Sequence, residues 1–143
     1  MFDQLSKWFV VFYLQLQHRY YLDLNNQFVN FYMAWNKGIN FGLFEGDSPI
    51  QVYFLFSVSV FICLVLLFWV RNSHNLLIQL LAALIIGGAL GNAIDRLLYG
   101  AVADFINFTC CGIRNPYSFN LADIFIFIGL IGLLIFKFDE KQN

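Results

Sequence analysis

Two aspartates stand at the edges of long apolar segments. Asp104 follows the glycine-rich segment "GGALGNAIDRLLYG", and Asp123 begins the apolar run "LADIFIFIGLIG". Carboxylates at a membrane edge are costly, so a functional role is the default hypothesis for each of them. Two carboxyl groups a few Å apart do not ionise together easily, so one holds a proton while the other stays charged. Such a pair can serve as general acid and general base on a single water molecule.

Long uncharged segments supply the elements that must position this pair. The chain has 143 residues, of which 60% are hydrophobic and 12% are charged. A chain this short cannot bury so much apolar surface in a globular core, so lipid is the expected solvent. Residues 50–70, 76–94 and 119–138 each approach the roughly 20 residues that cross a bilayer. They predict three membrane helices, and the short turn "RNSH" makes the first two of them neighbours.

The segment before these helices is less regular. "MFDQLSKWFVVFYLQLQ" predicts a first membrane helix that is shortened at its start, with Asp3 and Lys7 on one face at i and i+4. Residues 18–49 are polar and aromatic, and their partial alternation predicts short strands or a hairpin outside the membrane. The expected architecture is an α-helical membrane protein with four transmembrane helices, forming one domain over residues 1–143.

This layout brings the two aspartates to one membrane face. After Asp104 the chain loops through "INFTCCGIRNPYS" and enters the last helix, whose first turn contains Asp123. In "NLAD" we expect Asn120 to be the N-cap and Asp123 the third helical residue of a capping box. A helix N-terminus favours a charged carboxylate. Our hypothesis is therefore that Asp123 holds the negative charge and Asp104 the shared proton.

Structural interpretations of the same residues remain open. An Asp at the third helical position is common, and Asp104 can be a solvated loop residue. Gly87 and Gly91, with Ala83 one turn earlier, predict a small-residue packing face. Asn92, Asp95 and Arg96 can form a network that holds a helix end, or they can contact a substrate.

Another class of function is also compatible with these acids. A small proton-coupled carrier or channel subunit would use Asp95, Asp104 and Asp123 as a proton relay. Nucleic-acid binding is disfavoured, because the net charge of −1 gives no basic surface. The sequence contains no HExxH or GxSxG motif, and its three cysteines have no metal-ligand spacing. We therefore expect no metal and no cofactor.

Four segments together resemble a known family. "GGALGNAIDRLLYGAVADFINF" and "SFNLADIFIFIG" resemble the two signature blocks of lipoprotein signal peptidase (signal peptidase II), a bacterial membrane aspartic peptidase. "DQLSK" is similar to the first-helix motif of that family, and "NKGINFGLF" to its Asn-x-Gly-x-x-Phe stretch. The four segments occur in the same order as in the family.

The resemblance implies residue roles. Asp104 and Asp123 would be the catalytic dyad, and Asp3 and Lys7 would belong to a supporting first helix. Six further residues would line or support the substrate pocket: Asn36, Gly38, Asn92, Asp95, Arg96 and Asn120.

The resemblance also implies a fold, a location and a substrate. Four membrane helices would carry a small β-cradle and a short surface helix on the outer side, with those pieces in residues 18–49 and 105–118. The protein would be a monomer in the bacterial inner membrane, in contact with phospholipid, with cytoplasmic termini and an active site at the outer leaflet. It would cleave diacylglyceryl-modified prolipoproteins on the N-terminal side of the modified cysteine. A non-catalytic homologue is the remaining alternative.

Overall fold

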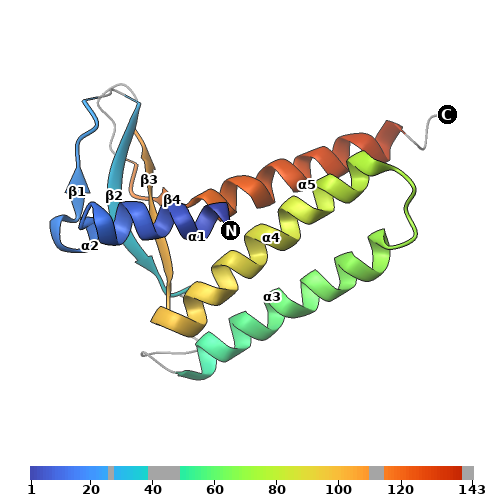
Figure 1. The fold of residues 1–143 in the computed structure, drawn as a ribbon, viewed down its shortest axis with the longest axis horizontal. Helices are drawn as coiled ribbons and strands as arrows, with labels where there is room; N and C mark the ends of the chain where they lie inside the picture. The colour runs from blue at the N-terminus through green and yellow to red at the C-terminus, as the bar shows by residue number, and fades with distance from the viewer. Residues whose placement is uncertain (26–27, 39–48, 110–114, 140–143) are drawn as a thin grey trace.

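Three long helices form the main layer of the molecule. The computed structural model describes residues 1–25, 28–38, 49–109 and 115–139. Helices α3 (Pro49–Val70), α4 (Leu76–Tyr99) and α5 (Leu121–Asp139) lie alongside one another, with α4 in the middle and packed against both neighbours (Figure 1). The three apolar segments are therefore helical, as predicted from the sequence.

Two of these helices are long and apolar enough to cross a membrane. They are α3, with a mean hydropathy of 2.6, and α4, with a mean hydropathy of 2.0. Only 6% of the α3 window is buried inside the protein, so its apolar side chains face outward on nearly every side, as those of a lipid-facing helix do. The apolar part of α5, Leu121–Phe136, is shorter. For the first and last helices, crossing the membrane stays a prediction.

The N-terminal segment is helical over two short stretches that follow each other directly. Helix α1 (Phe2–Lys7) continues as the π-helix η1 (Trp8–Tyr13). At about 1.5 Å per residue the two together extend about 18 Å, which is less than the roughly 30 Å of a hydrocarbon core. The helix starts beside α4 and α5 and runs towards the sheet, where the short helix α2 (Leu16–Arg19) follows (Figure 1).

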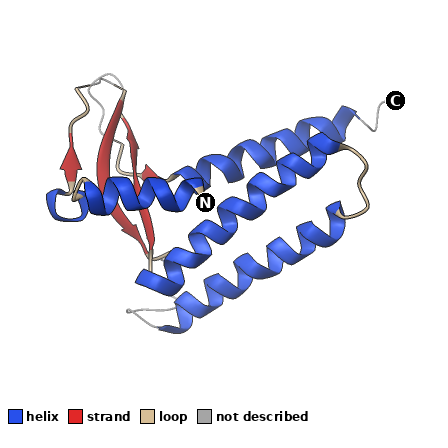
Figure 2. Cartoon of the chain, in the orientation of Figure 1, coloured by secondary structure: helices blue, strands red, loops and turns tan. Residues whose placement is uncertain are grey.

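A four-stranded antiparallel sheet stands at one end of the helical layer (Figure 2). Its order is β1 (Tyr21–Leu22), β2 (Val29–Asn36), β3 (Val102–Phe108) and β4 (Ser118–Phe119). Strands β1 and β2 confirm the short strands predicted in residues 18–49, and residues 39–48 of that segment lie outside the described residues. The prediction that a loop begins at residue 106 is wrong, because β3 continues to Phe108. The first four residues of β3 are all buried, so its sequence lacks the alternation that marks a half-exposed strand.

An apolar cluster fastens the sheet to the N-terminal helices. It consists of buried side chains from η1, α2, β2 and β3: Val10, Val11, Leu16, Met33, Ala103 and Phe105. Because Ala103 and Phe105 flank Asp104 along β3, their burial fixes the position of the strand that carries this aspartate.

Small residues let α4 and α5 approach closely, and of the predicted face only Gly91 takes part, while Gly87 and Ala83 do not. A Cβ on Gly87 would meet no atom within 4 Å, and Ala83 is exposed. A Cβ on Gly88 would lie 2.5 Å from the Ala122 carbonyl oxygen at the start of α5. A Cβ on Gly91 would lie 2.8 Å from an Asp3 carboxylate oxygen. The contact face of α4 therefore runs through Gly88, one residue away from the predicted line.

Candidate active site

Asp104 is held in the interior by strand β3. Gly100, with φ +72°, caps the end of α4 in the left-handed conformation, and β3 begins two residues later. The Asp104 side chain is only 3% exposed. Its Oδ1 accepts a hydrogen bond from Asn120 Nδ2 at 2.6 Å, and its Oδ2 accepts one from Asn36 Nδ2 at 3.1 Å. The interpretation of Asp104 as a solvated loop residue is therefore wrong.

Asp123 lies in the first turn of α5, within the predicted capping box. Its backbone N donates to Asn120 Oδ1 at 3.0 Å, and the backbone N of Asn120 donates to Asp123 Oδ2 at 3.2 Å. The second carboxylate oxygen, Oδ1, accepts from Asn92 Nδ2 at 2.8 Å. The capping box is thus confirmed, and Asp123 receives one further donor from α4.

Asn120 joins the two carboxyl groups. Its side-chain amide donates to Asp104, while its backbone N donates to Asp123. Burial, and then the neighbouring charge of Asp123, raise the pKa of Asp104 to about 6, against the opposing effects of the donors Asn36 and Asn120 and the charge of Lys7. Asp104 therefore keeps its proton more readily than an exposed aspartic acid.

A buried ionic cluster supports the pair from the other side. Lys7 Nζ lies 2.7 Å from Asp3 Oδ2 and 2.7 Å from Asp95 Oδ2. Asp3, Lys7 and Asp95 are all at most 3% exposed. Asp95 Oδ2 also accepts from the backbone N of Ala103 at 3.2 Å, next to Asp104. The predicted pairing of Asp3 with Lys7 is confirmed, and this pair fastens α1 to α4 and β3.

Two further contributors to this cluster are not among the predicted site residues. Gln4 Nε2 donates to Asp95 Oδ1 at 2.7 Å and to the Gly91 carbonyl oxygen at 3.1 Å. The backbone N of Ala122 donates to Asp3 Oδ1 at 2.9 Å. Gln4 follows Asp3 in the "DQLSK" segment, so that segment was the available signal. The bond from Ala122 is made by the backbone and leaves no trace in residue types.

Asn36 reaches Asp104 from the end of β2 through a tight turn. Its Oδ1 accepts from the backbone N of Gly38 at 2.9 Å, which leaves Nδ2 directed at Asp104. Gly38 has φ +97°, and a Cβ there would overlap the side chain of Leu55 on α3. Glycine is therefore needed at this position. Asn40 lies outside the described residues.

Arg96 borders an apolar cavity between the helices. The cavity has a volume of about 580 Å³ and is lined mainly by apolar side chains of α3, α4 and α5, together with Asn92 and Arg96. Arg96 Nη1 donates to the Asn92 carbonyl oxygen at 3.2 Å. Its Nε is buried without a hydrogen-bond partner among the described residues. A polar carbonyl group at the end of an apolar chain would suit this cavity.

All ten predicted site residues lie in or beside this network, except that Gly38 contacts it only through Asn36. Within the described part of the chain, no three His, Cys, Asp or Glu side chains are arranged to hold a metal ion.

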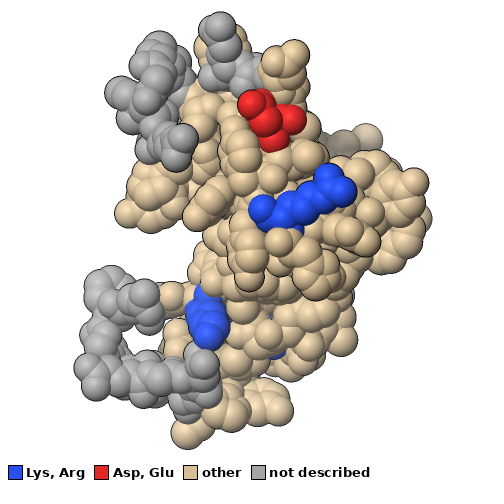
Figure 3. All heavy atoms as spheres, turned by 90° about the vertical axis from the view of Figure 1, so that its left-hand side faces the viewer, with Lys and Arg blue, Asp and Glu red and all other residues tan. Residues whose placement is uncertain are grey.

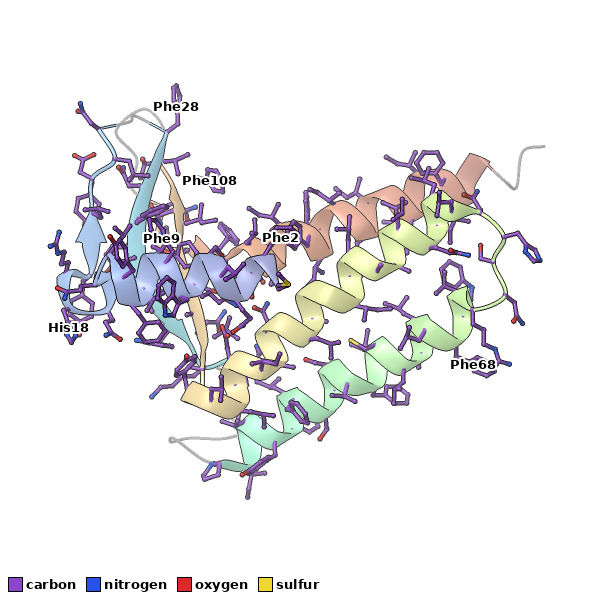
Figure 4. All side chains as sticks on the ribbon, viewed as in Figure 1. Phe2, Phe9, His18, Phe28, Phe68 and Phe108 are labelled. Carbon is purple, nitrogen blue, oxygen red and sulfur yellow. The ribbon has the colours of Figure 1, made fainter. Side chains whose placement is uncertain are left out.

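Other residues noted in the sequence lie away from the site. His18 lies at the end of the molecule that carries the sheet, away from the long helices (Figure 4). Among the described residues, few charged side chains are exposed on the face at the sheet end (Figure 3). Cys63 is a buried packing residue, as expected, and Cys110 and Cys111 lie outside the described residues.

The fold and the site define a class of protein: a mainly helical one suited to a membrane, with two acidic side chains tied to the start of one helix. The family model described as signal peptidase (SPase) II matches residues 1–138, and this chain belongs to that family. It is 40% identical to the lipoprotein signal peptidase of Nitrobacter hamburgensis over 139 residues, which cover 95% of this chain and 84% of that protein.

Two further similarities agree with this assignment. The lipoprotein signal peptidase of Methylorubrum extorquens is 40% identical over 108 residues, or 76% of this chain and 63% of that protein. A solved structure of a bacterial membrane enzyme superposes with a TM-score of 0.79 at 30% identity, covering 98% of this chain and 82% of that one. The resemblance stated from the sequence is thereby confirmed at the level of the family.

Proposed function

We propose that this protein is a membrane aspartic endopeptidase that removes the signal peptide of diacylglyceryl-modified prolipoproteins. The bond cut would be the peptide bond on the N-terminal side of the lipid-modified cysteine. Asp104 and Asp123 would be the catalytic pair. The observation that carries this proposal is Asn120, which donates one hydrogen bond to each carboxyl group and so ties both to one small volume.

The protonation states follow from the surroundings of each carboxyl group. Asp104 is buried and has a pKa of about 6, which suits a general acid that enters the reaction protonated. Asp123 accepts hydrogen bonds from the backbone N of Asn120 and from Asn92 Nδ2, and a carboxylate held by donors in this way can accept a proton from water. Asp123 is therefore the general base in this proposal.

The reaction would proceed through a tetrahedral intermediate without a covalent enzyme adduct. Asp123 takes a proton from water as the water oxygen attacks the scissile carbonyl carbon, and Asp104 gives its proton to the carbonyl oxygen. In the second half, Asp123 returns a proton to the leaving amine while Asp104 regains one from the hydroxyl of the intermediate. The C–N bond breaks, and both carboxyl groups end in their starting states.

The remaining side chains would bind and orient the substrate. Arg96 Nε has no hydrogen-bond partner within the described ranges and lies beside the apolar cavity, which fits a substrate carbonyl next to an acyl chain. Asn36 would keep Asp104 in place through its 3.1 Å hydrogen bond. We further propose a monomeric single domain in the bacterial inner membrane, crossing it four times, with phospholipid around it, cytoplasmic termini and the active site at the outer leaflet.

The direct test is cleavage of a purified prolipoprotein by the purified protein in detergent. Two substrates are compared, one carrying diacylglycerol on its conserved cysteine and one unmodified. We expect cleavage of the modified substrate only, with the modified cysteine as the new N-terminus by mass spectrometry. If wild-type protein never cuts either substrate, the proposal is wrong and a carrier or a non-catalytic homologue becomes the better interpretation.

A further inference from the structure

Lys7 uses its ammonium group on three acceptors at once. Nζ donates to Asp3 Oδ2 at 2.7 Å, lies 2.7 Å from Asp95 Oδ2, and donates to Asn92 Oδ1 at 3.0 Å. An ammonium group has three N–H donors, so these contacts occupy all of them. The first bond lies within α1, and the second connects α1 to Asp95 on α4. The third reaches a side chain that itself contacts the candidate catalytic pair.

The bond from Lys7 is one of three that fix how the Asn92 amide is turned. Asn92 Oδ1 accepts from Lys7 and from Asn120 Nδ2 at 3.1 Å, while Asn92 Nδ2 donates to Asp123 Oδ1 at 2.8 Å. Turning the amide by 180° would set its NH2 group against two donors and its oxygen against a carboxylate. Only one orientation satisfies every partner.

We propose that Lys7 is a positioning residue for the reaction: by holding the Asn92 oxygen, it keeps the Asn92 N–H directed at Asp123. This inference rests on the proposed function, because it assigns Lys7 a task in the same site. Lys7 does not touch the carboxyl groups of the candidate dyad. It acts through Asn92, across the interface between α1 and α4. The N-terminal helix would therefore control the hydrogen bonding of the candidate dyad as well as the stability of the fold.

The charge of Lys7 adds a second effect that a purely structural residue would lack. Around the pair, the described charged groups are Asp3 and Lys7 on α1 together with Asp95 and Arg96 on α4. The positive charge of Lys7 opposes the rise in the pKa of Asp104. Without it, Asp104 would keep its proton to higher pH. Activity that needs a protonated Asp104 would then fall at a higher pH than in the wild type.

The experiment compares Lys7→Met with Asp3→Asn, using the lipid-modified precursor in detergent. Asp3→Asn disturbs the same ionic cluster and can keep an oxygen acceptor for Ala122 N, but it leaves the Lys7–Asn92 bond in place. The double variant D3N/K7M removes both members of the Asp3–Lys7 pair, leaves Asp95 with its donors Gln4 Nε2 and Ala103 N, and serves where Lys7→Met alone does not fold. For Lys7→Met we expect kcat to fall by about tenfold to a hundredfold with little change in KM, as for loss of a hydrogen bond to a charged group.

The pH profile decides between a positioning and a structural role. We expect the alkaline limb of kcat/KM to move to higher pH in Lys7→Met and in D3N/K7M, and to stay in place in Asp3→Asn. A wild-type kcat, or a reduced kcat with an unmoved limb, would overturn the inference. Failure of wild-type protein to cut any precursor would instead overturn the proposed function.

A second variant tests the inference without removing Lys7. Asn92→Asp keeps an oxygen acceptor for Lys7 and for Asn120 but replaces the N–H donor facing Asp123 with an oxygen. We expect the protein to fold and kcat to fall by at least about tenfold. A wild-type kcat in this variant would show that the N–H directed at Asp123 has no role, and the inference would fail.

Discussion

Asn120 has two separable roles, and replacing it by Ala or by Ser distinguishes them. As the N-cap of α5, its Oδ1 accepts from the backbone N of Asp123 at 3.0 Å. As a donor, its Nδ2 reaches Asp104 Oδ1 at 2.6 Å and Asn92 Oδ1 at 3.1 Å. Serine retains an oxygen for the cap but has no amide to reach Asp104. Alanine retains neither.

The two roles predict effects of different size on different quantities. Loss of an N-cap costs about 1 kcal/mol of unfolding free energy, so Asn120→Ala should unfold at a lower temperature than Asn120→Ser. Loss of a hydrogen bond to a carboxyl group is worth about 1.5–3 kcal/mol, which corresponds to about 10- to 150-fold in kcat/KM. Both variants should show this loss. The hydrogen bond from Asn120 also lowers the pKa of Asp104. In both variants, the alkaline limb of the kcat/KM profile should therefore move to higher pH.

The assay combines thermal unfolding in detergent with initial rates of precursor cleavage across pH. Asn120→Ser is the informative variant, since its stability should stay close to that of the wild type while its activity falls. If Asn120→Ser cleaves at the wild-type rate, the donor to Asp104 has no part in catalysis. If activity falls only in proportion to the fraction of protein unfolded, the capping role explains everything and the reasoning is refuted.

Three other predictions follow from single contacts. Gly88→Ala should lower the unfolding temperature, because its Cβ would lie 2.5 Å from the Ala122 carbonyl oxygen. Gly87→Ala, whose Cβ would meet no atom within 4 Å, should be neutral or stabilising by up to about 1 kcal/mol. Equal unfolding temperatures for the two variants would contradict the packing described. As pH rises from about 4 to about 6, the stability of Asp104→Asn relative to the wild type should increase by up to about 3 kcal/mol. The reason is that the pKa of Asp104 is about 6 in the folded state and 3.8 in the unfolded state, which costs the wild type stability in that window. A difference in unfolding temperature that does not change with pH would exclude this effect. Asn36→Ala should reduce kcat/KM by about tenfold through loss of its bond to Asp104, and an unchanged rate would remove Asn36 from the site.

Local patterns in the sequence were sufficient for much of the fold and part of the site. The three apolar segments gave the long helices, because burial in lipid demands an uninterrupted run of apolar residues. "NLAD" predicted the capping box of Asn120 and Asp123, since that motif involves residues three apart. Asp3 and Lys7 were paired for the same reason, being one helical turn apart.

Contacts between distant segments were not predictable in this way. The pairing of Lys7 with Asp95, 2.7 Å apart, depends on how α1 crosses α4, and no spacing in the chain encodes that crossing. The contact of Gly88 with α5 was also not predictable, because the predicted line through Gly87 is equally rich in small residues. The local residue pattern did not mark β3 as a strand, because both faces of its first four residues are buried. Asp104 therefore had a plausible interpretation as a loop residue until the strand was placed.

The measurement that tests the central claim most directly is the single-turnover cleavage of a diacylglyceryl-modified precursor by Asp104→Asn and by Asp123→Asn. Both carboxyl groups are assigned to one water molecule, so each variant alone should lose nearly all activity while remaining folded, and the double variant should be no slower than the worse single variant. Wild-type cleavage by both single variants would contradict the account, and the chemistry would then have to lie elsewhere in the molecule.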